Sequence, residues 1–181
     1  MRNNQLRLYN DFYFPIKVGE KLALVFYLLI VWFALAFFLF MKKQLSIVEN
    51  IFIFLFFHFV NKNVLTLMSL NLGLMTYSKE PHLFIAYFIS RNILGPVLLL
   101  IFINKVFRKR WLTRIGYGVA IIGVALCLDK FSISAGIIEY KKWTFFYSFI
   151  LTILYLFFLY IIASVYRKIK EKGESKFGAD Y

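Results

Sequence analysis

Residues 51–77 read IFIFLFFHFVNKNVLTLMSLNLGLMTY, and this stretch decides how the whole chain folds. Its first part, 51–57, is entirely apolar, so the segment is hydrophobic enough to enter a bilayer. The remainder carries amides, hydroxyls and a lysine. Ionisable and polar residues inside a membrane segment are rare and unfavourable, and they usually face a buried partner or a water-filled cavity. The stretch therefore predicts a membrane helix with one polar face.

Most of these polar residues share one face of a helix that turns by 100° per residue. The face comprises His58, Lys62, Thr66, Ser69, Gly73 and Thr76, within an arc of roughly 80°, with Asn61 about 60° to one side. Two interpretations stay open. The stripe is either a hydrophilic pathway or a polar seam that is hydrogen-bonded to neighbouring helices.

The composition places the whole chain in a membrane. The 181 residues are 61% hydrophobic, which is more apolar surface than a soluble domain of this length can bury. The net charge of +13 comes from Lys and Arg beside the apolar spans, where the positive-inside rule and anionic lipid headgroups both favour them. We expect an all-α integral protein of the cytoplasmic (plasma) membrane, with anionic lipids rather than nucleic acid as partners.

Five apolar segments are long enough to cross the hydrocarbon core. They are 22–41, 51–77, 83–105, 112–135 and 143–166. A cleaved signal peptide competes as an explanation of the first segment, but the apolar run continues past the possible Ala34-Leu35-Ala36 cleavage site. We therefore expect an uncleaved span.

Three regions follow from these segments. Residues 1–21 are expected to lie along the headgroups, residues 22–167 to form the helical membrane domain, and residues 168–181 to form a basic cytoplasmic tail. The tail is expected to extend the last helix and to lose its helical structure by Gly173.

The second segment leaves the number of spans open. A break at Asn61-Lys62-Asn63 would give a six-pass or re-entrant variant, but no proline or glycine lies there, so one long tilted helix is preferred. Counting Lys and Arg favours six spans over five, and both topologies place the C-terminus in the cytoplasm. The five-span topology places the N-terminus outside.

Two corners of the sequence resemble each other. Gly73-Leu74-Met75-Thr76-Tyr77 and Gly136-Ile137-Ile138-Glu139-Tyr140 each end a span with Gly, three residues and Tyr, 63 positions apart. They indicate a weak parallel repeat in which spans two and three match spans four and five.

The same corners carry a family resemblance over roughly residues 45–167. Glu49 before the long second span, Gly73-Leu74…Tyr77 and Gly136-Ile137…Tyr140…Trp143…Tyr147-Ser148-Phe149 are similar to a family of small, uncharacterised, multi-spanning proteins of spore-forming Firmicutes. The chain departs from that pattern at Thr66, where an acidic residue is usual, and at Met75, where Trp is usual, and it keeps the second acid as Asp129. The resemblance implies fold and localisation, and it brings no activity with it.

The third and fourth spans place opposite charges at similar depths. Arg91 and Asn92 lie about a third of the way into the third span, ahead of a Gly95-Pro96 kink that frees a backbone carbonyl. Arg91 is roughly 12 Å and Asp129 roughly 10 Å from the outer ends of their spans. We expect these two residues to form an ion pair.

The sequence gives no sign of catalysis. It has no H-E-x-x-H, G-x-S-x-G, phosphate-binding glycine loop or CxxC motif, and its one cysteine, Cys127, lies in an apolar run. His58 and Ser69 are about 16 Å apart on one helix, which excludes direct proton transfer. No enzyme activity, cofactor or metal is expected.

Two functions remain for the sequence. The first is a structural or interaction subunit of a membrane assembly. It would associate with itself or with other membrane subunits through small residues of the fourth span and the polar seam of the second. The alternative is a small permease, channel or solute-binding membrane subunit. The candidate intramembrane polar site is the set His58, Asn61, Lys62, Thr66, Ser69, Arg91, Asn92 and Asp129.

Overall fold

A computed structural model describes residues 18–177 of the chain and the side chains of residues 21–169. Most of the expected interfacial segment (1–17) and the end of the tail (178–181) lie outside the described residues. The helices are α2 (Val18–Phe40), α3 (Ile47–Thr66), α4 (Pro81–Ile89), α5 (Gly95–Val106), α6 (Trp111–Ser134) and α7 (Phe145–Phe177). Two π-helical turns, η1 (Leu67–Asn71) and η2 (Ser90–Leu94), continue α3 and join α4 to α5.

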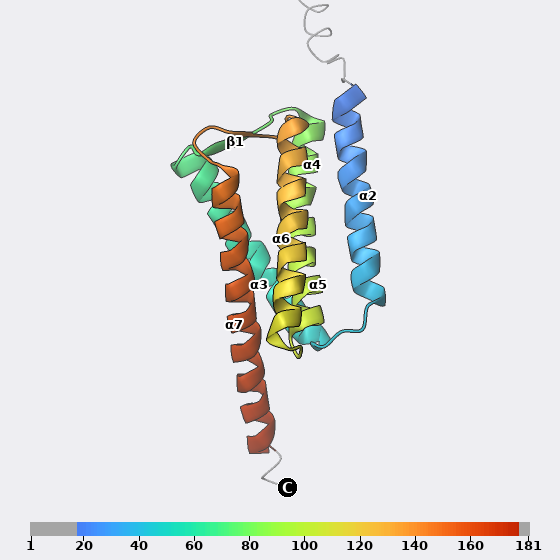
Figure 1. The fold of residues 1–181 in the computed structure, drawn as a ribbon, viewed down its shortest axis with the longest axis vertical. Helices are drawn as coiled ribbons and strands as arrows, with labels where there is room; N and C mark the ends of the chain where they lie inside the picture. Colours follow the sequence, from blue (N-terminus) through green and yellow to red (C-terminus); the bar gives the residue numbers. More distant parts are fainter. Residues whose placement is uncertain (1–17, 178–181) are drawn as a thin grey trace, which may run out of the picture.

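These elements form five helices that are long and apolar enough to cross a membrane (Figure 1). They lie side by side, with α2 at one edge of the bundle and α7 at the other. The chain runs in the same direction in α3 and α6 and in the opposite direction in α4–α5 and α7. We name the two ends of the bundle the strand end, which carries β1 and β2, and the basic end, which carries the loops at 41–46 and 107–110.

The second span is one continuous helix. Ser46 caps α3 by accepting a hydrogen bond from the Glu49 backbone, and the Glu49 carboxylate binds the Ser46 N–H in return, which satisfies two free N–H groups at the helix start. The helix then runs to Asn71, and the break considered at Asn61-Lys62-Asn63 does not occur. Without proline or glycine at that point, nothing interrupts the backbone hydrogen bonds.

The two similar corners have the same element order and meet each other. Gly73 and Gly136 end their helical segments with φ of 57° and 70°, the left-handed region in which glycine is favoured. A short strand follows each glycine: β1 (Met75–Tyr77) and β2 (Ile138–Tyr140). The strands pair antiparallel, with Thr76 opposite Glu139. This small sheet ties the second half of the bundle to the first at the strand end.

The last helix is longer than expected. α7 continues through Gly173 to Phe177, so the expectation that the tail loses its helical structure by Gly173 is wrong. Lys and Glu, which dominate the sequence from Arg167 to Lys176, are good helix formers, and one glycine among them costs only about 1 kcal/mol.

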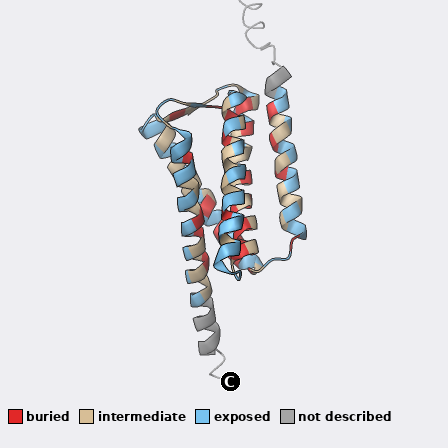
Figure 2. Ribbon diagram, in the orientation of Figure 1, coloured by how far each residue is buried: buried red, intermediate tan, exposed pale blue. Residues whose placement is uncertain are grey.

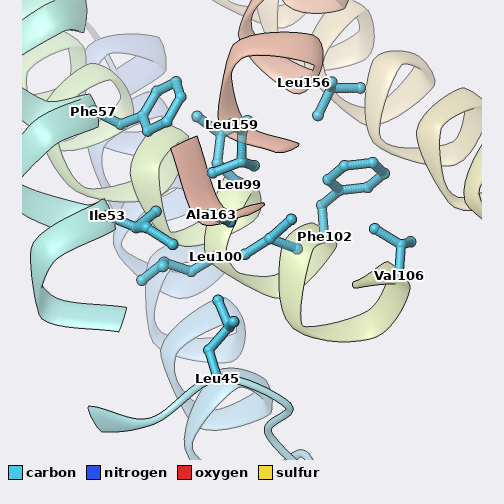
Figure 3. Close-up of a cluster of buried hydrophobic side chains, with 11 residues drawn as sticks. Leu45, Ile53, Phe57, Leu99, Leu100, Phe102, Val106, Leu156, Leu159 and Ala163 are labelled. Atoms are coloured by element: carbon cyan, nitrogen blue, oxygen red, sulfur yellow. The ribbon is translucent and has the colours of Figure 1, made fainter. Parts of the chain in front are cut away.

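Buried side chains form two apolar clusters, one toward each end of the bundle. The buried positions lie where helices face each other, and the outer faces are exposed (Figure 2). The cluster near the basic end joins the 41–46 loop, α3, α5 and α7 through residues such as Ile53, Leu100 and Leu159 (Figure 3). The cluster near the strand end joins α2, α4, η2 and the β2 corner through residues such as Tyr27 and Ile137.

Candidate functional site

A charged pair lies in the interior of the bundle, beside the cluster near the strand end. The Arg91 Nη2 atom is 2.7 Å from the Asp129 Oδ1 atom, and the two side chains are 23% and 12% exposed. The ion pair expected from their depths in the sequence is therefore confirmed. It joins η2 to α6 and neutralises two charges that are unfavourable in a poorly hydrated interior.

The backbone of η2 explains how α3 binds next to this pair. Pro96 has no N–H group to bond the Asn92 carbonyl, and the Gly95 N–H bonds the Ser90 carbonyl instead of that of Arg91. The freed carbonyls accept hydrogen bonds from His58 Nδ1 (3.2 Å) and Asn61 Nδ2 (2.6 Å). Because a carbonyl only accepts, His58 carries its proton on Nδ1 in this contact. The carbonyls freed next to Gly95-Pro96 thus hold α3 against η2 through these two hydrogen bonds.

Asp129 also receives a hydrogen bond from the β2 corner. The Tyr140 hydroxyl donates to Asp129 Oδ2 at 3.0 Å and lies 2.9 Å from Ser148 Oγ, which also accepts from the Trp143 indole at 2.8 Å. Burial and the neighbouring Asp129 carboxylate raise the pKa of Tyr140 to about 12. The hydroxyl therefore stays protonated at physiological pH and remains a donor.

A cavity of about 110 Å³ lies against this polar layer. Its wall includes Phe57 and Leu99 from one apolar cluster and Leu65 and Leu94 from the other. The wall also includes polar residues, among them Asn61, Arg91, Asp129, Tyr140, Ser148 and Tyr155. The Tyr155 hydroxyl donates to Asn61 Oδ1 at 3.3 Å, which links α7 to α3 across the same layer.

One buried polar atom of this layer is unsatisfied. Arg91 Nε is buried, and it has no hydrogen-bond partner among the residues that the structure describes. Both carboxylate oxygens of Asp129 accept hydrogen bonds. Each of these oxygens can accept one further hydrogen bond, and the charges of the pair already balance.

The eight predicted polar residues do not form a single site. Asn61, Arg91 and Asp129 line the cavity, and His58 binds the η2 backbone. Lys62 and Thr66 are exposed on the outer face of α3. Ser69 and Asn92 bond to carbonyls of their own helices, those of Leu65 and Phe88. The polar stripe of α3 therefore does not line the cavity as a unit.

Several residues of the site were not singled out from the sequence. They are Tyr140, Trp143, Ser148 and Tyr155. The first three belong to the corner motif from Gly136 to Phe149, so a signal was present, but a Tyr and a Trp at a span end are equally typical of a membrane interface. Tyr155 sits in an unbroken apolar run and gave no signal at all.

A second polar cluster, at the basic end, was also missed and has a structural role. The Asn104 side chain accepts from the backbone N–H groups of Gln44 and Leu45 and donates to Asn50 Oδ1 at 2.6 Å. The Asn50 amide then donates to the carbonyls of Leu45 and Ser46. These bonds hold the loop between α2 and α3 against α5.

Within residues 18–177, no group of three or more His, Cys, Asp or Glu side chains is placed to hold a metal ion. The arrangement is best suited to binding an uncharged molecule, because its fixed charges compensate each other. Comparison with known proteins adds no constraint: no family model, curated protein or solved structure matches the chain. The resemblance to membrane proteins of spore-forming Firmicutes stays a prediction.

Proposed function

We propose that this chain is a non-enzymatic membrane subunit that spans the cytoplasmic membrane five times and assembles with a second copy of itself through α6. One observation supports the assembly role. Of the residues in α6, only Gly118, Asp129 and Ser132 are buried within the chain, and the helix exposes a continuous row of small residues. A helix that exposes small residues on its outer face is suited to close contact with another helix.

The row consists of Gly116, Ala120, Gly123 and Cys127, all of which are exposed. At 100° per residue they fall within an arc of about 60°. A Cβ atom placed on Gly116 or Gly123 would meet no atom within 4 Å. The chain therefore does not use this face for its own packing, and small side chains let two helix backbones approach closely in lipid.

The native Cys127 provides a direct test, because it is the one cysteine of the chain and lies on this face. Mild oxidation of membranes that contain the protein should give a disulfide-linked dimer on a non-reducing gel. In a symmetric contact, residue 127 of one copy faces residue 127 of the other. Ala120→Leu should lower the dimer yield at least about fivefold by separating the helices.

A matched cysteine serves as the control. Cys127→Ala combined with Leu154→Cys moves the thiol to an exposed position of α7. This variant should not cross-link. Equal cross-linking from positions 127 and 154, or a yield at 127 that Ala120→Leu leaves unchanged, would show random collision and would overturn assembly through α6.

A second candidate function is a solute-binding membrane subunit, and the interior cavity favours it. The route considered from the sequence, a lining made by His58, Lys62, Thr66 and Ser69, receives no support, because Lys62 and Thr66 face outward. Binding would instead use Asn61, Arg91 and Asp129 together with the β2 corner.

A further inference from the structure

Lys62 is an exposed cation close to the middle of its span. The span covers Ile47–Asn71, and Lys62 lies roughly 5 Å along the axis from its midpoint. In a hydrocarbon core of about 30 Å centred on the same point, the Lys62 backbone is about 10 Å below the nearer boundary, at the strand end. A charged side chain at this depth normally faces a bundle interior or a water-filled cavity and has a partner. Lys62 instead lies on the outer face of α3.

The direction of the helix keeps the Lys62 ammonium group away from the nearer headgroups. In an α-helix the Cα–Cβ bonds tilt toward the N-terminus, and α3 begins at the basic end (Figure 1). The side chain of Lys62 therefore starts out toward the middle of the bilayer. Its four-carbon stem reaches roughly 6 Å, which is less than the distance to the headgroups at the strand end. A lipid phosphate is consequently out of reach.

The chain itself offers Lys62 no partner. Among residues 21–169, whose side chains the structure describes, Arg91 and Asp129 form the only ion pair, and the Lys62 ammonium group makes no hydrogen bond. The Thr66 hydroxyl, one turn further along the same exposed face, makes none either. Two neighbouring donors thus lie at the surface of α3, and the charge of one of them is not compensated within this part of the chain.

A second copy of the chain does not supply the missing charge. Of the nine acidic residues, only Glu49 and Asp129 lie within the five candidate spans. Glu49 closes the cap at the start of α3, and Asp129 is paired with Arg91. A second copy therefore has no free carboxylate at the depth of Lys62, and the compensating group must come from a different protein.

A carboxylate on a neighbouring helix has the chemistry that this surface requires. It carries the opposite charge, and its two oxygens accept hydrogen bonds, so it can bind the Lys62 ammonium group and the Thr66 hydroxyl together. We propose that Lys62 and Thr66 form a docking site for a membrane helix of a second protein, which carries an Asp or Glu side chain near the middle of the bilayer. The site lies on α3 and is independent of assembly through α6.

Designed membrane helices test the site because they differ at one residue only. The probes are three leucine-rich, single-span peptides with lysines at both ends and with Asp, Asn or Leu at one position near the middle. Each peptide carries an acceptor dye. The full-length protein carries a donor dye at Lys79→Cys, an exposed position, in a Cys127→Ala background. Energy transfer in liposomes should show that the Asp peptide associates about tenfold more tightly than the Asn or Leu peptide, as expected for a buried charge pair.

Two exposed lysines make matched variants. Lys62→Met removes the proposed cation and no contact within the described chain, so it should abolish the preference for the Asp peptide. Lys130 is also exposed, but it lies in the last turns of α6, close to the strand end. Lys130→Met should therefore leave the preference unchanged.

Charge reversal separates an ion pair from a general loss of structure. Lys62→Glu should no longer bind the Asp peptide and should instead bind a fourth peptide with Lys at the same position, which the unmodified chain should reject. Binding of the Asp peptide to Lys62→Glu as tightly as to the unmodified chain would contradict the charge pair.

The outcomes also separate this site from the assembly face. Ala120→Leu should leave the preference for the Asp peptide unchanged, and Lys62→Met should leave cross-linking through Cys127 unchanged. Equal association of the Asp and Asn peptides, or a preference for Asp that persists in Lys62→Met, would overturn the docking site whatever the result for α6.

Discussion

At the scale of single residues, Arg91 and Asp129 matter because each is tolerable only with the other. Both side chains are mostly buried and lie beside the apolar cluster near the strand end. Removing one partner leaves an uncompensated charge, whereas replacing both by apolar groups can be nearly neutral. This asymmetry distinguishes a structural ion pair from a surface contact.

We predict that Asp129→Asn lowers the free energy of unfolding by about 3 kcal/mol. The amide keeps the shape of the carboxylate and can still accept a hydrogen bond from Tyr140, so the loss reports the unpaired Arg91 charge. Unfolding in mixed detergent micelles, followed by circular dichroism, measures the change.

The double variant Arg91→Met with Asp129→Leu is the control. It should recover most of the lost stability, because no charge remains buried. A double variant as unstable as Asp129→Asn would mean that the pair stabilises the fold through its hydrogen bonds and not through charge compensation.

The sequence was informative about this pair and less so about its surroundings. Spacing along two helices predicted that Arg91 and Asp129 lie at the same depth, because helical rise is regular. The hydrogen bonds of His58 and Asn61 to η2 were not predicted. The Asn92 carbonyl is free because Pro96 has no N–H group, but the Arg91 carbonyl is freed only where η2 replaces the α-helix. The choice between an α-turn and a π-turn depends on packing that a local pattern does not record.

At the scale of elements, the two glycine corners set how the halves of the bundle join. Gly136 has a φ of 70°, from which the chain turns directly into β2. A side chain in this conformation costs roughly 1–2 kcal/mol. A Cβ atom there would meet no other atom within 4 Å, so the penalty comes from the backbone alone.

We predict that Gly136→Ala lowers the free energy of unfolding by about 1 kcal/mol. Gly118→Ala is the matched control, because Gly118 lies in the middle of α6 and a Cβ there would meet Leu156 and Phe102 at 3.9 Å, an ordinary contact. That variant should gain up to about 1 kcal/mol from helix propensity. Detergent unfolding compares the two, and equal effects would contradict the role of the corner.

The element level also shows where a weak sequence pattern was useful. The likeness of the Gly73 and Gly136 corners predicted copies that share one direction, and α3 and α6 do run the same way (Figure 1). That the corners pair as β1 and β2 was not predicted. Strand pairing between distant segments depends on the fold that brings them together, and three-residue strands carry little pattern of their own.

At the scale of the whole molecule, length and hydropathy were sufficient to predict five long helices. Length and hydropathy did not predict which of these helices pack against each other. α2 packs against α4 and α5, whereas α7 packs against α3, α5 and α6. In a chain whose spans are all apolar, hydrophobicity does not select partners, so small residues, kinks and polar contacts decide the packing.

The distribution of charge between the two ends predicts how the molecule lies in the membrane. The basic end carries a dense set of cations: Lys42, Lys43, Lys105, Arg108, Lys109, Arg110, Arg114, Arg167 and Lys168. Among the side chains that the structure describes (21–169), the strand end has fewer cations, and the acidic residues Glu80 and Glu139 lie among them. Because cytoplasmic loops retain Lys and Arg, we expect the basic end inside and the strand end outside.

Single cysteines in a Cys127→Ala background test this orientation. Glu139→Cys and Arg108→Cys place thiols at exposed positions on opposite ends of the bundle. A membrane-impermeant maleimide should label position 139 in intact cells and position 108 only after permeabilisation. The reverse labelling pattern would mean that the basic end faces outward, against the positive-inside rule. The basic cluster would then bind something other than the anionic lipids of the cytoplasmic leaflet.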